Sequence, residues 1–198
     1  MLAVSAASCN DFLTIEPQDK LVQDNFFTNT AMVRSNTLTL YASRTWRDFH
    51  MNFQWKLDML NGDMFYTYSD EGQWFFGSYT SINPYINEGW KGLYNVIAFA
   101  NSVINDMPGK CQGVSEEDKN KAIAEARCVR AYCYYIIAEV WHDAPIVHNN
   151  TQNIADGDID LPRNTQKSIY QFALNDLDFA ERHLPDTDAD AMASHTDY

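Results

Sequence analysis

The sequence predicts an all-α protein, a tetratricopeptide-like helical repeat scaffold that carries long irregular aromatic loops. The first observation is segment 122–147, where apolar residues recur at helical spacing and then fill every side from Ala131 onward. A helix that is apolar on all sides must be covered on all sides, so this segment should lie in the middle of a helical domain. The second observation is that helices of similar length follow one another as pairs, as in a helical-repeat solenoid.

Two helices are expected before the central one. The first covers about 30–46, and the second covers about 85–107 and ends at Pro108 and Gly109. Asn101 interrupts the apolar stripe of the second helix, and we expect a buried amide that bonds a neighbouring backbone group. The other residues of that stripe are Trp90, Tyr94, Ile97 and Ile104.

The central helix carries its own start and stop signals. Ser115 and Asp118 resemble the capping box that opens a helix, and His142 suits its C-terminal turn because histidine tolerates left-handed backbone. Arg130 lies near the buried zone, so we expect a structural salt bridge there. A fourth helix over about 165–184 should begin a second pair. Its predicted buried face is Ile169, Ala173, Leu177, Ala180 and Leu184.

Segment 48–83 shows no helical period and is rich in aromatic residues, which predicts a long aromatic loop with short helical pieces at most. Three consecutive rings, at 74–76, cannot all point into one core, so at least one should be exposed. An exposed ring beside an amide or a carboxylate suits a sugar. The predicted glycan-binding residues are Trp74, Phe75, Tyr79, Asn61 and Asp63. The alternative is that these rings only fill the gap between helices.

The composition excludes several classes of function. The formal net charge of −13 disfavours nucleic acid and favours a neutral ligand or a protein partner. No run of eighteen apolar residues is present, so no spanning helix is expected. His142 and Asp143 lack a nucleophile in a strained elbow, and nothing marks the paired carboxylates of a glycosidase. We expect no enzyme.

No cofactor or metal site is expected either. The acidic loop 156–160 resembles the start of a calcium loop, but Leu161 and Lys167 occupy the positions that need glycine and glutamate. The acidic loop 186–190 fails similarly, because Ala191 stands in place of glycine. Cys128 and Cys133 are five residues apart on one helix and cannot bridge, so they are expected to be small core residues.

The N-terminus predicts a membrane anchor. Residues 1–8 are uncharged and look like the remnant of a lipoprotein signal peptide, with Ala6, Ala7 and Ser8 placed before Cys9 as in a lipobox. Cys9 is the predicted lipid attachment site, segment 9–29 a tether, and the lipid the only contact with the membrane. The alternative is a buried free cysteine in an N-terminal arm. We also expect the chain to be truncated at both ends.

Five landmarks resemble the SusD/RagB family of outer-membrane nutrient-binding lipoproteins from Bacteroidetes. They are S-C-N-D-F-L-T-I-E-P (8–17), G-W-K-G-L-Y-N-V-I-A-F-A-N-S-V-I (89–104), E-A-R-C-V-R-A-Y-C-Y-Y (125–135), W-H-D-A-P-I-V (141–147) and L-P-R-N-T-Q-K-S-I-Y (161–170), the last leading to D-L-D-F-A-E-R-H-L-P (176–185). Family members often have glycine where His142 stands. The resemblance implies that 30–198 is a SusD-like N-terminal helical domain, cut before its C-terminal part.

The resemblance also implies a function. It implies four tetratricopeptide-like pairs in the complete protein, lipidation of Cys9, and a place on the surface of the cell outer membrane. It implies capture of a glycan or peptide and capping of a SusC-like TonB-dependent transporter, with the irregular loops holding the ligand. We therefore expect a surface glycan-binding lipoprotein. The alternative is a helical-repeat adaptor that binds only protein and has no glycan site.

Overall fold

The computed structural model describes residues 27–66, 69–158 and 160–185. The predicted signal remnant, Cys9, most of the tether and the acidic loop 186–190 lie outside the described residues. The described chain is helical, with one isolated antiparallel bridge between Ala144 and Asn164. The all-α prediction is confirmed. None of the described helices is both long and apolar enough to cross a bilayer.

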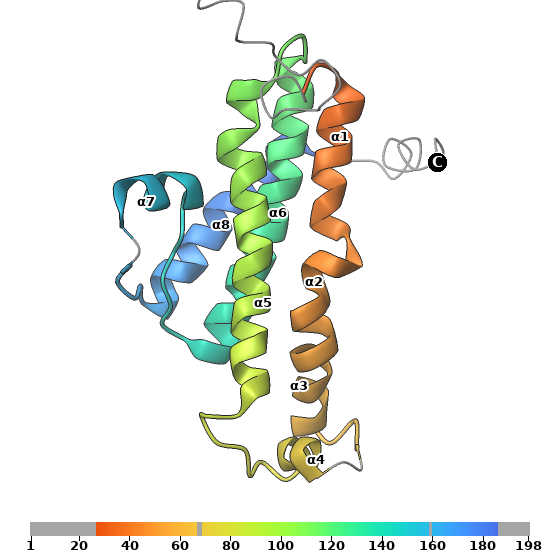
Figure 1. Ribbon diagram of the computed structural model, residues 1–198, viewed down its shortest axis with the longest axis vertical. Coiled ribbons are helices and arrows are strands. Elements are labelled where there is room, and N and C mark those ends of the chain that lie inside the picture. Colours follow the sequence, from red (N-terminus) through yellow and green to blue (C-terminus); the bar gives the residue numbers. More distant parts are fainter. Residues whose placement is uncertain (1–26, 67–68, 159, 186–198) are drawn as a thin grey trace, which may run out of the picture.

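The first arm of the fold is a column of short helices joined end to end, drawn in orange in Figure 1. The column consists of α1 (Thr30–Leu38), a 3₁₀ turn (Thr39–Tyr41), α2 (Ser43–Phe49), a π turn (His50–Gln54) and α3 (Trp55–Leu60). The extended backbone of Ala42, with φ −63° and ψ 133°, separates α1 and its 3₁₀ turn from α2.

The prediction of an aromatic loop from residue 48 is therefore wrong up to Leu60. Trp46, Phe49, Phe53 and Met59 are all buried along this column. Together with the buried Lys56 they are spaced three, four, three and three residues apart, which is helical. Because a lysine takes one of these positions, the apolar period is interrupted and the segment reads as irregular in the sequence.

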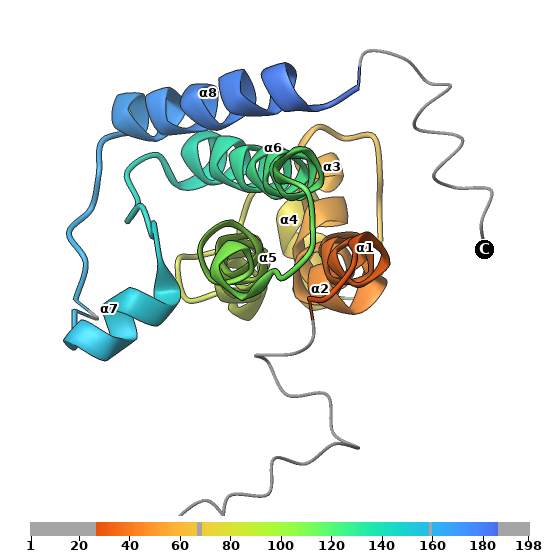
Figure 2. The same ribbon diagram turned by 90° about the horizontal axis from the view of Figure 1, so that it is seen from above.

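An antiparallel pair forms the centre of the molecule, as predicted. It consists of α5 (Pro84–Asn101), which continues through a π turn (Ser102–Asp106), and α6 (Glu116–Trp141), with a short 3₁₀ turn (Pro108–Lys110) between them. Asn83 caps α5, and Pro84 stands at its first turn, where a missing N–H costs nothing. Figures 1 and 2 show the two helices side by side and running in opposite directions.

The last helix, α8 (Gln166–His183), follows the short helix α7 (Asn150–Asp156) and packs on the outer side of α6. In Figure 2, α6 lies between α8 on one side and α5 with α1 and α2 on the other, which is the central position that its apolar sequence predicts. One predicted core residue of α8 is wrong: Leu177 is 43% exposed, and Asp176 takes the buried position beside it.

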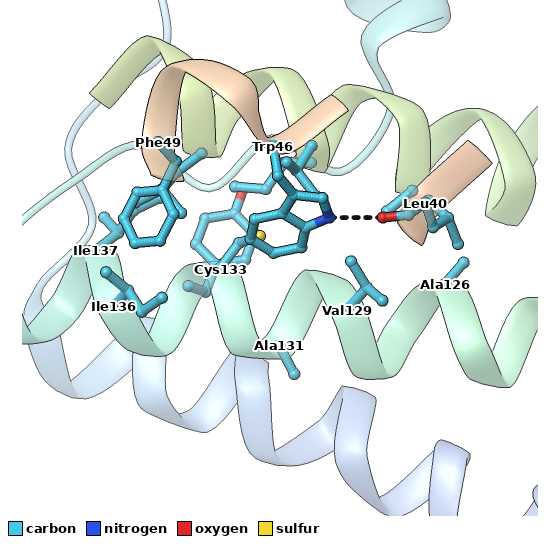
Figure 3. Close-up of a cluster of buried hydrophobic side chains, with 14 of the residues drawn as sticks. Leu40, Trp46, Phe49, Ala126, Val129, Ala131, Cys133, Ile136 and Ile137 are labelled. Carbon is cyan, nitrogen blue, oxygen red and sulfur yellow. Dashed lines mark hydrogen bonds between the residues drawn. The ribbon is translucent and has the colours of Figure 1, made fainter. Parts of the chain in front are cut away.

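The core between α6 and the first column is apolar and closely packed, as Figure 3 shows. Ala126, Val129 and Cys133 of α6 face Leu40 and Trp46, whose indole N–H donates to the carbonyl of Leu40 at 2.6 Å. The prediction that Cys133 is a core residue is confirmed, and burial raises the pKa of its thiol. Cys128 is only half-buried. Cys111, Cys128 and Cys133 are free thiols.

A buried polar network joins the three long helices. Arg130 of α6 donates from Nε and Nη2 to the two carboxylate oxygens of Asp176 on α8, at 2.7 and 2.8 Å. Its Nη1 donates to Oδ1 of Asn101 on α5 at 2.6 Å. The amide nitrogen of Asn101 donates in turn to the carbonyl of Val147 at 2.9 Å. The predicted salt bridge of Arg130 and the buried amide of Asn101 are both confirmed.

The ends of α6 also follow the sequence signals. The hydroxyl of Ser115 accepts from the backbone N–H of Asp118 at 3.1 Å and donates to its carboxylate at 2.8 Å. At the other end His142 has φ 61°. No other non-glycine residue in the described part of the chain has a positive φ. The chain turns there and then forms the bridge at Ala144.

The cap of α6 gives a first testable expectation. Replacing Ser115 with alanine removes the acceptor for the Asp118 N–H and is expected to lower the free energy of unfolding by about 1 kcal/mol. Chemical denaturation measures this change. Ser81→Ala, in an exposed turn, is the control and should stay within about 0.5 kcal/mol of the parent. Equal stability of the two variants would show that the cap contributes nothing.

Candidate functional site

The strongest concentration of exposed apolar side chains lies where α3 meets α4 (Ser69–Phe75), at the lower end of the molecule in Figure 1. We call residues 60–83 the tip. Scattered apolar residues on a surface are normal, but a contiguous group marks an interaction site. The exposed large apolar residues of the tip are Leu60, Met64, Phe65, Tyr66, Phe75, Phe76 and Ile82.

Trp74, the most prominent predicted glycan ligand, is a core residue. It is 2% exposed and packs edge-on against Phe53, with ring centroids 5.7 Å apart. Tyr79 is half-buried and stacks on Trp74, at 4.4 Å between centroids and 12° between planes. Because Tyr79 and Phe53 cover it, Trp74 has no free ring face, and the gap-filling alternative holds for this ring. It can act only as the support beneath Tyr79.

Phe75 and its neighbours supply the exposed rings. Phe75 is 37% exposed, Phe65 56% and Phe76 73%. They pack edge to face, with centroids 5.0 Å apart for Phe65 and Phe75 and 5.3 Å for Phe75 and Phe76. The expectation that three consecutive rings leave at least one exposed is confirmed. The sequence does not single out Phe65 and Phe76; the run of rings at 74–76 is the available signal for Phe76.

The predicted polar residues lie on the turn that follows α3. Asn61 ends the helix, Gly62 adopts φ 81°, and the backbone N–H of Asp63 donates to the carbonyl of Asp58 at 3.2 Å. Both side chains are exposed. They therefore keep an amide and a carboxylate available at the same end of the molecule as the exposed rings.

A buried lysine holds the tip together. Lys56 of α3 is fully buried, and its Nζ lies 3.8 Å from the ring centroid of Trp55 and 3.6 Å from that of Tyr85 on α5. Glu71 of α4 lies 3.7 Å from the same nitrogen. The cation thus contacts groups on all three helices that meet at the tip. No group of three or more metal-ligating side chains gathers anywhere in the described chain.

Over residues 11–197 the chain matches the model of a SusD-like family, described as "Starch-binding associating with outer membrane". The chain belongs to this SusD-like family. A SusD-like protein of Bacteroides ovatus is 32% identical over 184 residues, which are 92% of this chain and 33% of that relative.

Solved structures share the fold. A crystal structure with xylogluco-oligosaccharide is 28% identical, with a TM-score of 0.66, over 78% of this chain and 30% of the other. A SusD superfamily protein from Bacteroides vulgatus is 20% identical with a TM-score of 0.69, over 82% of this chain and 36% of that one, and supports the fold alone. The predicted SusD-like fold is confirmed. The chain spans about a third of the length of these relatives.

Proposed function

We propose that this chain is the N-terminal part of a cell-surface glycan-binding lipoprotein of the outer membrane, working with a SusC-like TonB-dependent transporter. The observation that carries the proposal is the likeness to a crystal structure with xylogluco-oligosaccharide, at 28% identity and a TM-score of 0.66. The description of the matching family, which binds starch and associates with the outer membrane, supports the same class of ligand and the same location.

At the tip, we assign the sugar contacts to Phe75, Tyr79, Asn61 and Asp63. The exposed side of Phe75 offers an apolar surface to a pyranose ring, and Phe65 and Phe76 extend it. Asn61 and Asp63 offer acceptors and a donor to the hydroxyl groups. Trp74 backs Tyr79 from inside the core. A few such contacts suffice for millimolar affinity, which corresponds to about −4 kcal/mol.

The glycan proposal is tested by titrating neutral oligosaccharides, including xylogluco-oligosaccharides, into the full-length protein. Phe75→Ala removes an exposed ring and should weaken binding about 2-fold to 13-fold, because such a contact is worth roughly 0.5–1.5 kcal/mol. Phe99→Ala is the matched control, since Phe99 is exposed to a similar extent on α5. If no glycan binds the parent protein, the helical-repeat adaptor becomes the better reading of the apolar tip.

The location and the partner have tests of their own. Cys9→Ala should release the protein from the membrane fraction of the cells, and continued retention would contradict the lipid anchor. Co-purification of the full-length protein with a SusC-like transporter from detergent extracts tests the partnership. We propose no catalytic step, and an unchanged glycan after prolonged incubation with the protein is the expected result of a hydrolysis assay.

A further inference from the structure

Two cations are buried among the described residues, Arg130 and Lys56, and they are held in different ways. Arg130 donates three hydrogen bonds to side chains, at 2.6–2.8 Å. The carboxylate of Glu71 approaches the Nζ atom of Lys56 to 3.7 Å, which is longer than a hydrogen bond. Two ring centroids lie at the same range from this nitrogen, that of Trp55 at 3.8 Å and that of Tyr85 at 3.6 Å. The ammonium group of Lys56 therefore contacts two ring faces and has a carboxylate close by.

A buried lysine is a costly way to join three helices. Taking an ammonium group out of water carries a large free-energy penalty, and a buried ion pair often stabilises a fold no better than apolar side chains of the same volume. A buried charge does supply a fixed geometry, because ring faces and a carboxylate hold the nitrogen at one point. Lys56 stands where α3, α4 and α5 meet, so the geometry that it fixes is that of the tip.

The short helix α4 is oriented by contacts of its inner face. It has seven residues, and helices this short are not stable by themselves in water. Glu71 and Trp74 are three residues apart and so lie on one face of α4. That face is held by Lys56 and by Phe53, both from the first column. Phe75 follows Trp74 directly, so these two inner contacts decide where its ring points.

Lys56 also supports the other half of the tip. The ring of Trp55, which the ammonium group contacts, packs edge-on against Tyr66 with centroids 5.5 Å apart. Tyr66 is 41% exposed and follows Phe65, whose ring meets that of Phe75 at 5.0 Å. One buried nitrogen thus underlies both sides of the exposed ring group, the segment after α3 and the helix α4. Figure 1 shows both at the lower end of the molecule.

We propose that Lys56 is a positioning residue for the glycan site of the tip. Because it is fully buried, it contacts no sugar itself. Its ammonium group fixes α4 and the ring of Trp55 relative to α5, and so presents the rings of Phe65 and Phe75 to the ligand in one arrangement. The ligand rests on the proposed function, whereas the orientation of α4 is a property of the protein alone and is measured separately.

The test measures the affinity of the full-length protein for a xylogluco-oligosaccharide by calorimetry, together with urea denaturation. Lys56→Met nearly keeps the length of the side chain and removes its charge. We expect it to weaken binding about 2-fold to 13-fold, the same range as Phe75→Ala, because the ring contact is displaced. Lys167→Met, at an exposed position on α8, is the matched control and should leave the affinity unchanged. A role in stability alone would change the free energy of unfolding but not the dissociation constant of the folded protein.

Glu71→Gln is a milder change, since it keeps the shape of a side chain that is 15% exposed and removes only its charge. It should also weaken binding. The double variant Lys56→Met/Glu71→Gln should bind no more weakly than Lys56→Met alone, because both changes break the same contact. Additive losses would show that the two residues act independently. Additive losses, or an unchanged affinity in both single variants while Phe75→Ala weakens binding, overturn the inference and leave the proposed function standing.

Hydrogen exchange tests the positioning without any ligand. The amides of α4 should exchange faster in Lys56→Met than in Lys167→Met, while those of α6 should exchange alike in the two variants. Equal exchange of α4 in both variants overturns the inference even if the parent protein binds glycan. If the parent protein binds no oligosaccharide, the proposed function fails and the assignment of Lys56 to a glycan site fails with it. Faster exchange of α4 would then leave only the orienting role of Lys56 standing.

Discussion

Replacing Asp176 with alanine is expected to lower the free energy of unfolding by about 3–5 kcal/mol. Arg130 is 5% exposed and keeps its charge, so losing two carboxylate hydrogen bonds leaves a buried cation with Asn101 as its remaining acceptor in the described chain. Arg127 adds to the effect, since its guanidinium lies 3.8 Å from the same carboxylate. A loss of this size is a large part of the 5–15 kcal/mol that typically stabilises a domain.

Urea denaturation followed by circular dichroism measures the change, with Asp178→Ala as the matched control. Asp178 belongs to the same helix and pairs with Arg182, but both side chains are exposed, so its removal should cost less than about 1 kcal/mol. The double variant Arg130→Met/Asp176→Leu replaces the pair with apolar side chains and should recover most of the loss. If Asp176→Ala matches Asp178→Ala, the buried network does not hold the helices together.

The buried network shows which of its residues the sequence predicts and which it does not. Arg130 and Asn101 are polar residues inside apolar helical stripes. Because buried polar groups are hydrogen-bonded, the sequence predicts that both are buried and have bonding partners. The helices α5, α6 and α8 were likewise predictable from their period and caps. The sequence does not predict Asp176 as the partner of Arg130. The two residues lie 46 positions apart, and their contact depends on how α8 is rotated about its axis against α6. The same rotation leaves Leu177 exposed.

The sequence predicts where the candidate site lies, but not which of its rings are exposed. The sequence placed an exposed ring at 74–76, yet which ring faces outward depends on how the short helix α4 sits on Phe53. Its orientation buries Trp74 and exposes Phe76. The exposure of Tyr132 and Tyr135 on α6 is not predicted either, for a related reason. Tyrosine counts as apolar in a periodic pattern, although its hydroxyl lets it stand at a surface.

The spacing between α2 and α5 depends on Gly92, and Gly92→Ala is expected to cost about 1–3 kcal/mol. A Cβ atom at this position would lie 2.6 Å from the backbone nitrogen of Phe49. Backbone atoms cannot rotate away as a side chain can, so the two helices must separate. The clash has to outweigh the gain of up to about 1 kcal/mol that alanine brings to a helix interior.

Gly109→Ala is the matched control, because a Cβ atom there meets nothing within 4 Å. Its free energy of unfolding should stay within about 0.5 kcal/mol of the parent value, as for most exposed substitutions. Since α2 continues through its π turn into α3, a shift at Gly92 should also move the tip and weaken glycan binding there. A Gly92→Ala protein as stable as the control would show that α2 and α5 tolerate a wider separation. The close approach of their backbones would then not be what positions the tip.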